Sequence, residues 1–120
     1  MIKRIIILGM YLFSLSSFAS TNMSYLACTN AVPTDNANFC SSFRIAAPCY
    51  CAESGVPAGM CQDMTKLYER MIAAFGSLKK ACEYQRYTST QDCIDNWNCF
   101  RLGGVDSHAK LCSSTGKACS

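Results

Sequence analysis

Ten cysteines constrain the fold of this chain more than any other feature of its sequence. They are Cys28, Cys40, Cys49, Cys51, Cys61, Cys82, Cys93, Cys99, Cys112 and Cys119. A cysteine content of about 10% in a short chain is typical of a disulfide-stabilised scaffold. We therefore expect five disulfides and a secreted or periplasmic location, because disulfides persist in oxidising compartments.

Metal binding is the alternative use of cysteine, and the spacing does not favour it. Zinc sites gather their ligands in closely spaced pairs with histidine as a common partner. This sequence has one C-x-C, at Cys49 and Cys51, no C-x-x-C, and a single histidine, His108. A thioredoxin-like redox site also needs C-x-x-C. We expect no metal and no cofactor.

Residues 1–19 have the pattern of a signal peptide that is removed by cleavage. Lys3 and Arg4 precede an apolar run over 5–18, and the small residues Ser17 and Ala19 predict cleavage before Ser20. The run is short for a membrane span, and nothing after it is long and apolar enough for one. We expect one domain over 20–120, with a short tail over 20–27.

Cys28 has a second interpretation, because Leu26-Ala27-Cys28 faintly resembles the cleavage box of a bacterial lipoprotein. Tyr25 stands where an aliphatic residue is usual in such boxes. Acylation of Cys28 would also leave nine cysteines, an odd number that secreted proteins tend to avoid. Lipidation at Cys28 is therefore the less favoured alternative.

The mature chain is nearly neutral and poor in large aliphatic residues. Without the signal peptide its net charge is +1, and it has fifteen Leu, Ile, Val and Phe residues. A near-neutral chain has little long-range field to attract nucleic acid, so we expect no nucleic-acid partner. A thin core is compensated by disulfides, which stabilise by roughly 2–4 kcal/mol each.

The hydrophobic periodicity predicts an all-α fold, a small disulfide-rich bundle of three to four helices. The central element is a long helix over 58–85, in which apolar residues recur at steps of three and four. Gly76 is its weak point. Seven residues form a candidate face for an apolar ligand or a partner: Met60, Met64, Leu67, Tyr68, Met71, Phe75 and Leu78.

Two further helices flank the long one. The first is predicted over 34–47, with Thr34 or Asp35 as its cap, and Pro48 is expected to end it and begin a loop over 48–59. The other is predicted over 89–102, where either Thr88 with Gln91 or Ser89 with Asp92 forms a capping box and Gly103-Gly104 ends the helix. Asp106 is expected to cap a short last turn through Leu111.

The same helices limit which cysteines can pair. Cys61 and Cys82 would stand about 30 Å apart along one straight helix, and Cys93 and Cys99 about 9 Å apart. A disulfide needs Cα atoms within about 7 Å. Neither pair can therefore form, and each end of the long helix should be linked to some other part of the chain. The helix before it is the natural neighbour of its start, and the helix after it can fold back along its other end. The disulfide connectivity stays open, because ten cysteines allow about 945 pairings.

Three functions are compatible with these features. The leading hypothesis is a non-enzymatic protein that binds a protein partner, as inhibitors, effectors and envelope-assembly factors do. Trp97, Phe100 and Tyr87 are candidate exposed anchors, although the core is the simplest place for Trp97. The second hypothesis is a carrier that encloses a lipid or other apolar ligand between its helices. The third is a small hydrolase.

The hydrolase hypothesis depends on Asp106-Ser107-His108, which contains the three residue types of a catalytic triad. Adjacent residues do not make a triad, because the imidazole must lie between the hydroxyl and the carboxylate. A helix cap followed by a surface serine and histidine is the simpler interpretation. We expect no catalytic residues and no enzyme activity.

Overall fold

The structure is a computed structural model that describes residues 28–119. The predicted signal peptide and the tail over 20–27 lie outside this range. The described part of the chain contains four α-helices: α2 (Phe39–Glu53), α3 (Met64–Phe75), α4 (Leu78–Tyr84) and α5 (Thr90–Leu102). Two 3-10 helices accompany them, η2 (Ala58–Met60) and η3 (Cys112–Ser114). The predicted all-α, disulfide-rich bundle is confirmed.

The prediction of one long helix over 58–85 was wrong. Asp63 caps a new helix, α3, by accepting a hydrogen bond from the Lys66 amide, and Gly76 ends that helix with φ 87° in the left-handed region. Ser77 then caps α4 by accepting from the Lys80 amide. Both breaks use the preferred chemistry of helix ends, a polar N-cap and a C-terminal glycine, and together they outweigh the continuous apolar periodicity.

The prediction that Pro48 ends the second helix was also wrong. Pro48 lies inside α2, which continues to Glu53. A proline in a helix interior costs about 3 kcal/mol because it removes a hydrogen bond and crowds the preceding turn. The residues just after it offset this cost, since Cys49 and Cys51 form disulfides and Cys51 is buried.

The start of this helix also differs from the expectation, because Thr34 and Asp35 are not its cap. Thr34 is hydrogen-bonded to the C-terminal part of the chain instead. Its hydroxyl donates to Asp106 at 2.9 Å, and its carbonyl accepts from the Ser113 amide. Helix α5 agrees with the prediction within one residue. The Ser89 hydroxyl accepts from the Asp92 amide at 3.1 Å, and the helix ends at Gly103.

The expected turn at Asp106 is a closed loop rather than a helical turn. Val105 and Leu111 form an isolated antiparallel bridge, and the Asp106 carboxylate accepts from the amides of His108 and Lys110 inside it. The helical turn that follows, η3, begins only after Leu111.

All ten cysteines are paired, with none free. The pairs are Cys28–Cys49, Cys40–Cys119, Cys51–Cys61, Cys82–Cys93 and Cys99–Cys112. The predicted exclusions are confirmed, since Cys61 does not pair with Cys82, nor Cys93 with Cys99. The sulfur of Cys28 is bonded to that of Cys49, so it cannot also carry a lipid. The pairing of Cys28 therefore contradicts lipidation at that residue.

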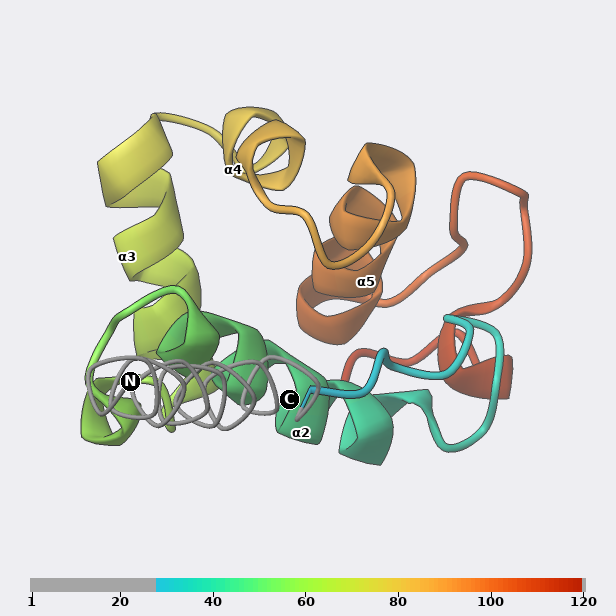
Figure 1. Ribbon diagram of the computed structural model, residues 1–120. Coiled ribbons are helices and arrows are strands. Elements are labelled where there is room, and N and C mark those ends of the chain that lie inside the picture. The colour runs from blue at the N-terminus through green and yellow to red at the C-terminus, as the bar shows by residue number, and fades with distance from the viewer. Residues whose placement is uncertain (1–27, 120) are drawn as a thin grey trace, which may run out of the picture.

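The four α-helices form a ring of neighbours. Helix α2 contacts both α3 and α5, and α4 contacts α3 on one side and α5 on the other. Figure 1 shows α3 and α5 rising from α2, with α4 between their far ends. Two disulfides close the ring where it turns: Cys51–Cys61 joins α2 to the segment before α3, and Cys82–Cys93 joins α4 to α5.

The core lies where α2 and α5 cross. Phe43 packs edge-on against Trp97, with ring centroids 4.8 Å apart, and also against Phe100. Trp97 and Phe100 are each 4% exposed, so the core position is confirmed for Trp97 and the exposed-anchor interpretation of both is wrong. Tyr87 is half-buried.

No helix among residues 28–119 is long and apolar enough to cross a membrane.

Candidate binding site

An apolar cavity of about 530 Å³ lies inside the helix ring. All four α-helices line it, together with the segments that follow α2 and α4. Its lining residues are Phe43, Ala47, Tyr50, Cys51, Ser54, Val56, Leu67, Arg70, Met71, Ala74, Phe75, Ala81, Tyr84, Gln85, Arg86, Tyr87, Cys93, Asn96 and Trp97. Small-molecule sites occupy about 300–1,000 Å³ and are predominantly apolar, so this cavity has the size and lining of one.

The inner wall of the cavity is buried and mostly apolar. Phe43 and Ala47 of α2, Leu67 of α3, and Trp97 of α5 are each no more than 5% exposed. Cys51 and Cys93 belong to the same wall, and their disulfides join α2 to the segment before α3 and α4 to α5. The wall is therefore fixed in shape by packing and by two cross-links.

The rim of the cavity is aromatic and partly exposed. Tyr50 of α2 stacks on Tyr87, which lies in the connection between α4 and α5. Phe75 of α3 contacts Tyr84 of α4, with ring centroids 5.0 Å apart, and Tyr84 is 71% exposed. These pairs close gaps between helices that are not covalently joined at those points.

Gln85 holds the connection between α4 and α5 in place. Its side-chain nitrogen donates to the carbonyls of Cys82 and Thr88, and its side-chain oxygen accepts from the amides of Tyr87 and Thr88. One amide side chain thus satisfies four groups of this connection. The position of Tyr87 at the rim depends on it.

Burial affects the chemistry of Tyr50. Its pKa is raised above the ordinary value, chiefly by burial and then by the neighbouring Tyr87 phenol, while a hydrogen bond from the Ala31 backbone opposes the rise. The Tyr50 hydroxyl donates to the side-chain oxygen of Asn30. This rim residue is a neutral hydrogen-bonding group at physiological pH, with no tendency to act as a base.

The cavity brings together only part of the face predicted from sequence. Leu67, Met71 and Phe75 line it. Met64 lines a different recess, Met60 is 48% exposed on η2, and Tyr68 packs on Trp97. Leu78 packs against the core cluster. The predicted face is therefore divided by the breaks at 61–63 and at Gly76.

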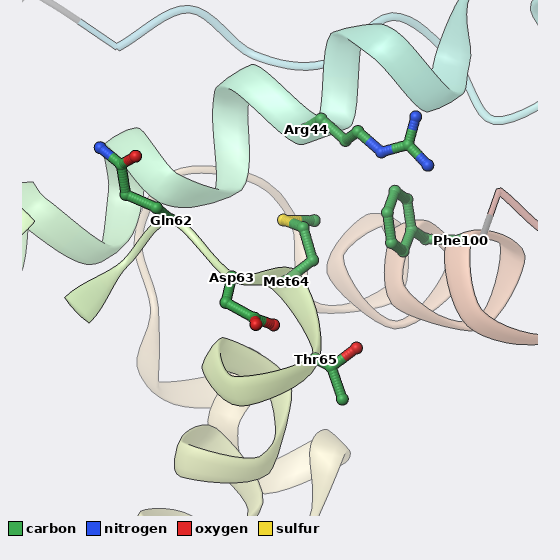
Figure 2. Close-up of a pocket in the computed structure, with 6 residues that line it drawn as sticks. All are labelled: Arg44, Gln62, Asp63, Met64, Thr65 and Phe100. Carbon is green, nitrogen blue, oxygen red and sulfur yellow. The ribbon is translucent and has the colours of Figure 1, made fainter. Parts of the chain in front are cut away.

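The second recess, of about 430 Å³, is more open than the cavity. Figure 2 shows the side chains that line it, among them Arg44, Asp63 and Phe100. Its charged groups already have protein partners. The Arg44 guanidinium lies 5.3 Å from the centre of the Phe100 ring and donates to the Cys119 carbonyl, and Asp63 caps α3. The charge of each group is thus already stabilised within the protein, and the recess is more open than the cavity, so it is the weaker candidate.

The three residues of the hydrolase hypothesis do not converge. The Ser107 hydroxyl donates to Asp95 of α5 at 2.6 Å, Asp106 accepts amide hydrogens of its own loop, and His108 is exposed. These hydrogen bonds stabilise the loop that follows α5 and attach it to that helix. Among residues 28–119, no group of three or more His, Cys, Asp or Glu side chains could hold a metal ion.

Several residues that line the cavity were not predicted as site residues from the sequence. Tyr50 and Ser54 belong to the loop predicted over 48–59, and Arg70 is not one of the seven residues of the predicted apolar face. Asn96 had no signal of its own, since a polar residue in an amphipathic helix is ordinarily solvent-facing.

Comparison of the chain with protein-family models, with curated proteins and with solved structures finds no match.

Proposed function

We propose that this protein is a non-enzymatic carrier that holds one small apolar molecule in the cavity of its helix ring. The observation that supports this most directly is the cavity itself. The space of about 530 Å³ between the four helices is open on one side, its inner wall is hydrophobic, and its volume lies in the range of small-molecule sites.

The cross-links suit a carrier. A site that is formed before the ligand arrives avoids the entropic cost of ordering loops and side chains on binding. Two of the five disulfides contribute cysteines directly to the wall, and the aromatic pairs at the rim fix the remaining boundaries. The disulfides indicate an oxidising compartment. Within it, the proposal places the protein in the periplasm or outside the cell.

The fluorescence of Trp97 gives a direct test. Trp97 is the only tryptophan in the chain and lines the cavity, so a ligand inside should change its emission. We expect the oxidised protein to bind dodecanol or dodecanoate saturably, below the concentration at which either aggregates. If neither ligand gives a saturable change in emission or heat, the proposal is wrong.

Two neighbouring alanines of α3 provide a matched pair of variants. Ala73 and Ala74 are both exposed, but only Ala74 lines the cavity. Ala74→Phe should occupy part of the cavity mouth and weaken ligand binding by about tenfold, whereas Ala73→Phe should leave it unchanged. Equal binding by the two variants would place the ligand elsewhere.

A protein partner is the second candidate function, and the loop after α5 favours it. Leu102, Val105 and Leu111 are 67%, 58% and 52% exposed, and the bridge between Val105 and Leu111 fixes two of them side by side. Exposed apolar groups held rigidly are suited to an interface. A partner captured by the wild-type protein should be lost with Val105→Ser plus Leu111→Ser and retained with Ile45→Ser, an exposed apolar residue of α2. Capture that is indifferent to these substitutions would exclude this surface.

A further inference from the structure

The charged groups of the cavity lining are of one sign. Arg70 of α3 and Arg86, two residues after α4, belong to the lining, and no Asp or Glu does. Given the carrier function proposed above, on which this inference rests, we propose that the ligand is a single-chain amphiphile with an anionic head group. The head group would contact Arg70 and Arg86, and the chain would occupy the apolar interior.

Neither arginine has a carboxylate partner among residues 28–119. The one ion pair in that range joins Lys110 to Asp35. Arg70 makes a single long hydrogen bond, 3.4 Å, from its Nη1 to the Met60 carbonyl. A guanidinium has five N–H donors, arranged to bind a carboxylate or phosphate through two hydrogen bonds at once. Most of the donors of Arg70 and Arg86 thus have no protein partner among residues 28–119.

The two other arginines of the described chain are used differently. Arg44 lies over the Phe100 ring, and Arg101 lies over the Tyr68 ring at 3.8 Å from its centre. Both therefore have an aromatic partner that stabilises their charge. Arg70 and Arg86 have none. The arginines that lack both a carboxylate and an aromatic partner are the two that line the cavity.

Asn96 is a second, independent sign of a polar ligand group. It is only 8% exposed, it lines the cavity, and its side chain has no hydrogen bond within residues 28–119. Its amide atoms are nevertheless not sealed in the core, because no fully buried side-chain nitrogen or oxygen in that range lacks a partner. A polar side chain with so little exposure is usually hydrogen-bonded, and the amide of Asn96 is free to bond a group that enters the cavity. A carboxylate has about four acceptor sites, which suffices for Asn96 as well as the arginines.

The arrangement matches an amphiphile rather than a purely apolar molecule. Arg86 is exposed and Arg70 is half-buried, so the charge lies toward the open side, whereas the buried lining residues other than Asn96 are apolar or aromatic. An anion at the mouth would remain partly hydrated. It would thereby avoid the large desolvation cost of a fully buried charge.

The test compares four ligands of one chain length: dodecanoate, dodecyl phosphate, dodecanol and dodecyltrimethylammonium. We expect the oxidised full-length protein to bind at least one anion about tenfold more tightly than dodecanol, and to bind the cation weakest. The anion preference should shrink as salt is added. The tighter of the two anions identifies the head group.

A charge-matched pair of variants locates the effect. Arg70→Gln plus Arg86→Gln should bring anion affinity down to that of dodecanol and leave dodecanol binding unchanged. Lys79→Gln plus Lys80→Gln removes the same charge from exposed positions of α4 outside the cavity, and should keep the anion preference. Dodecanol binding also shows that each variant is folded.

The outcomes separate this inference from the carrier function. Equal affinity for dodecanol and both anions, or an anion preference that survives loss of both arginines, would overturn the inference and leave the carrier function intact. Binding of no ligand by the wild-type protein would overturn the carrier function itself.

Discussion

Tyr50 and Tyr87 stack face to face, with ring centroids 4.4 Å apart and ring planes 8° from parallel. Tyr50 belongs to the part of α2 beyond Pro48, and Tyr87 to the connection between α4 and α5. The pair therefore joins the base of the helix ring to its opposite side without a covalent link. It also forms part of the cavity rim, so its loss should affect both stability and ligand binding.

Removing one ring of this pair should destabilise the protein measurably. Aromatic pairs contribute about 0.5–1.5 kcal/mol beyond their buried area. We expect Tyr87→Ala to lower the free energy of unfolding in urea, with the disulfides intact, by at least that amount, and to weaken dodecanol binding. Tyr87→Phe retains the ring and should lose little. Equal losses in the two variants would show that the hydroxyl, not the stack, is important.

Stability should fall at high pH because of Tyr50. The pKa of its phenol is higher in the folded protein than in the unfolded chain, so the folded state holds this proton more tightly. The contribution is fully present below a pH of about 10 and is lost as the pH rises through the folded pKa. Unfolding in urea across this range should show a steeper decline for the wild-type protein than for Tyr50→Phe. Parallel declines would contradict the assignment.

Asp106 should have the opposite effect at low pH. Burial raises its pKa, but hydrogen bonds from the Lys110 amide, the Thr34 hydroxyl and the His108 amide, with the His108 charge, outweigh burial and lower the pKa overall. The resulting stability is present above the ordinary pKa of about 4 and is lost as the pH falls through the folded pKa. A carboxyl titration by NMR should show the lowered midpoint. Asp106→Asn should unfold with a flatter acid dependence, whereas an unchanged dependence would exclude this carboxylate as its source.

Gly103 and Gly104 form a matched pair for a steric test. Both have positive φ, 70° and 86°, so alanine is conformationally strained at either position by about 1–2 kcal/mol. A Cβ at Gly103 would also lie 2.5 Å from the Ala118 nitrogen and 2.7 Å from the Gly116 oxygen, whereas a Cβ at Gly104 meets nothing within 4 Å. We expect Gly103→Ala to lower the melting temperature clearly more than Gly104→Ala. Similar losses would mean that the C-terminal segment does not pack on the end of α5.

The elements best predicted from sequence are those whose ends have strong local signals. Helix α5 begins at a serine cap and ends at a glycine, and both positions were found within one residue. The same signals stand at Asp63, Gly76 and Ser77, but the apolar periodicity continues unbroken from 58 to 85 and on its own predicts a single helix. Periodicity reports which residues face the core, and it persists across a break when both helices pack on the same neighbours.

The continuation of α2 through Pro48 was not predictable from local sequence. Its cause is long-range: Cys49 pairs with Cys28, Cys51 pairs with Cys61, and Tyr50 stacks on Tyr87. The cavity depends on this continuation, because Tyr50 and Cys51 form part of its wall. Leu67, Met71 and Phe75 could be chosen from their spacing alone. Arg70 and Asn96 required the three-dimensional arrangement of α3 and α5.

The disulfide between Cys40 and Cys119 has a consequence for how the chain acquires its bonds. Three pairs join cysteines that follow one another in sequence, at Cys51–Cys61, Cys82–Cys93 and Cys99–Cys112. These can form one after another in chain order, without waiting for distant cysteines. Cys40 must instead remain unpaired, or exchange a temporary partner, until Cys119 is available 79 residues later. This disulfide therefore closes the longest loop of the five, and a thiol-disulfide isomerase would act most usefully at that one bond.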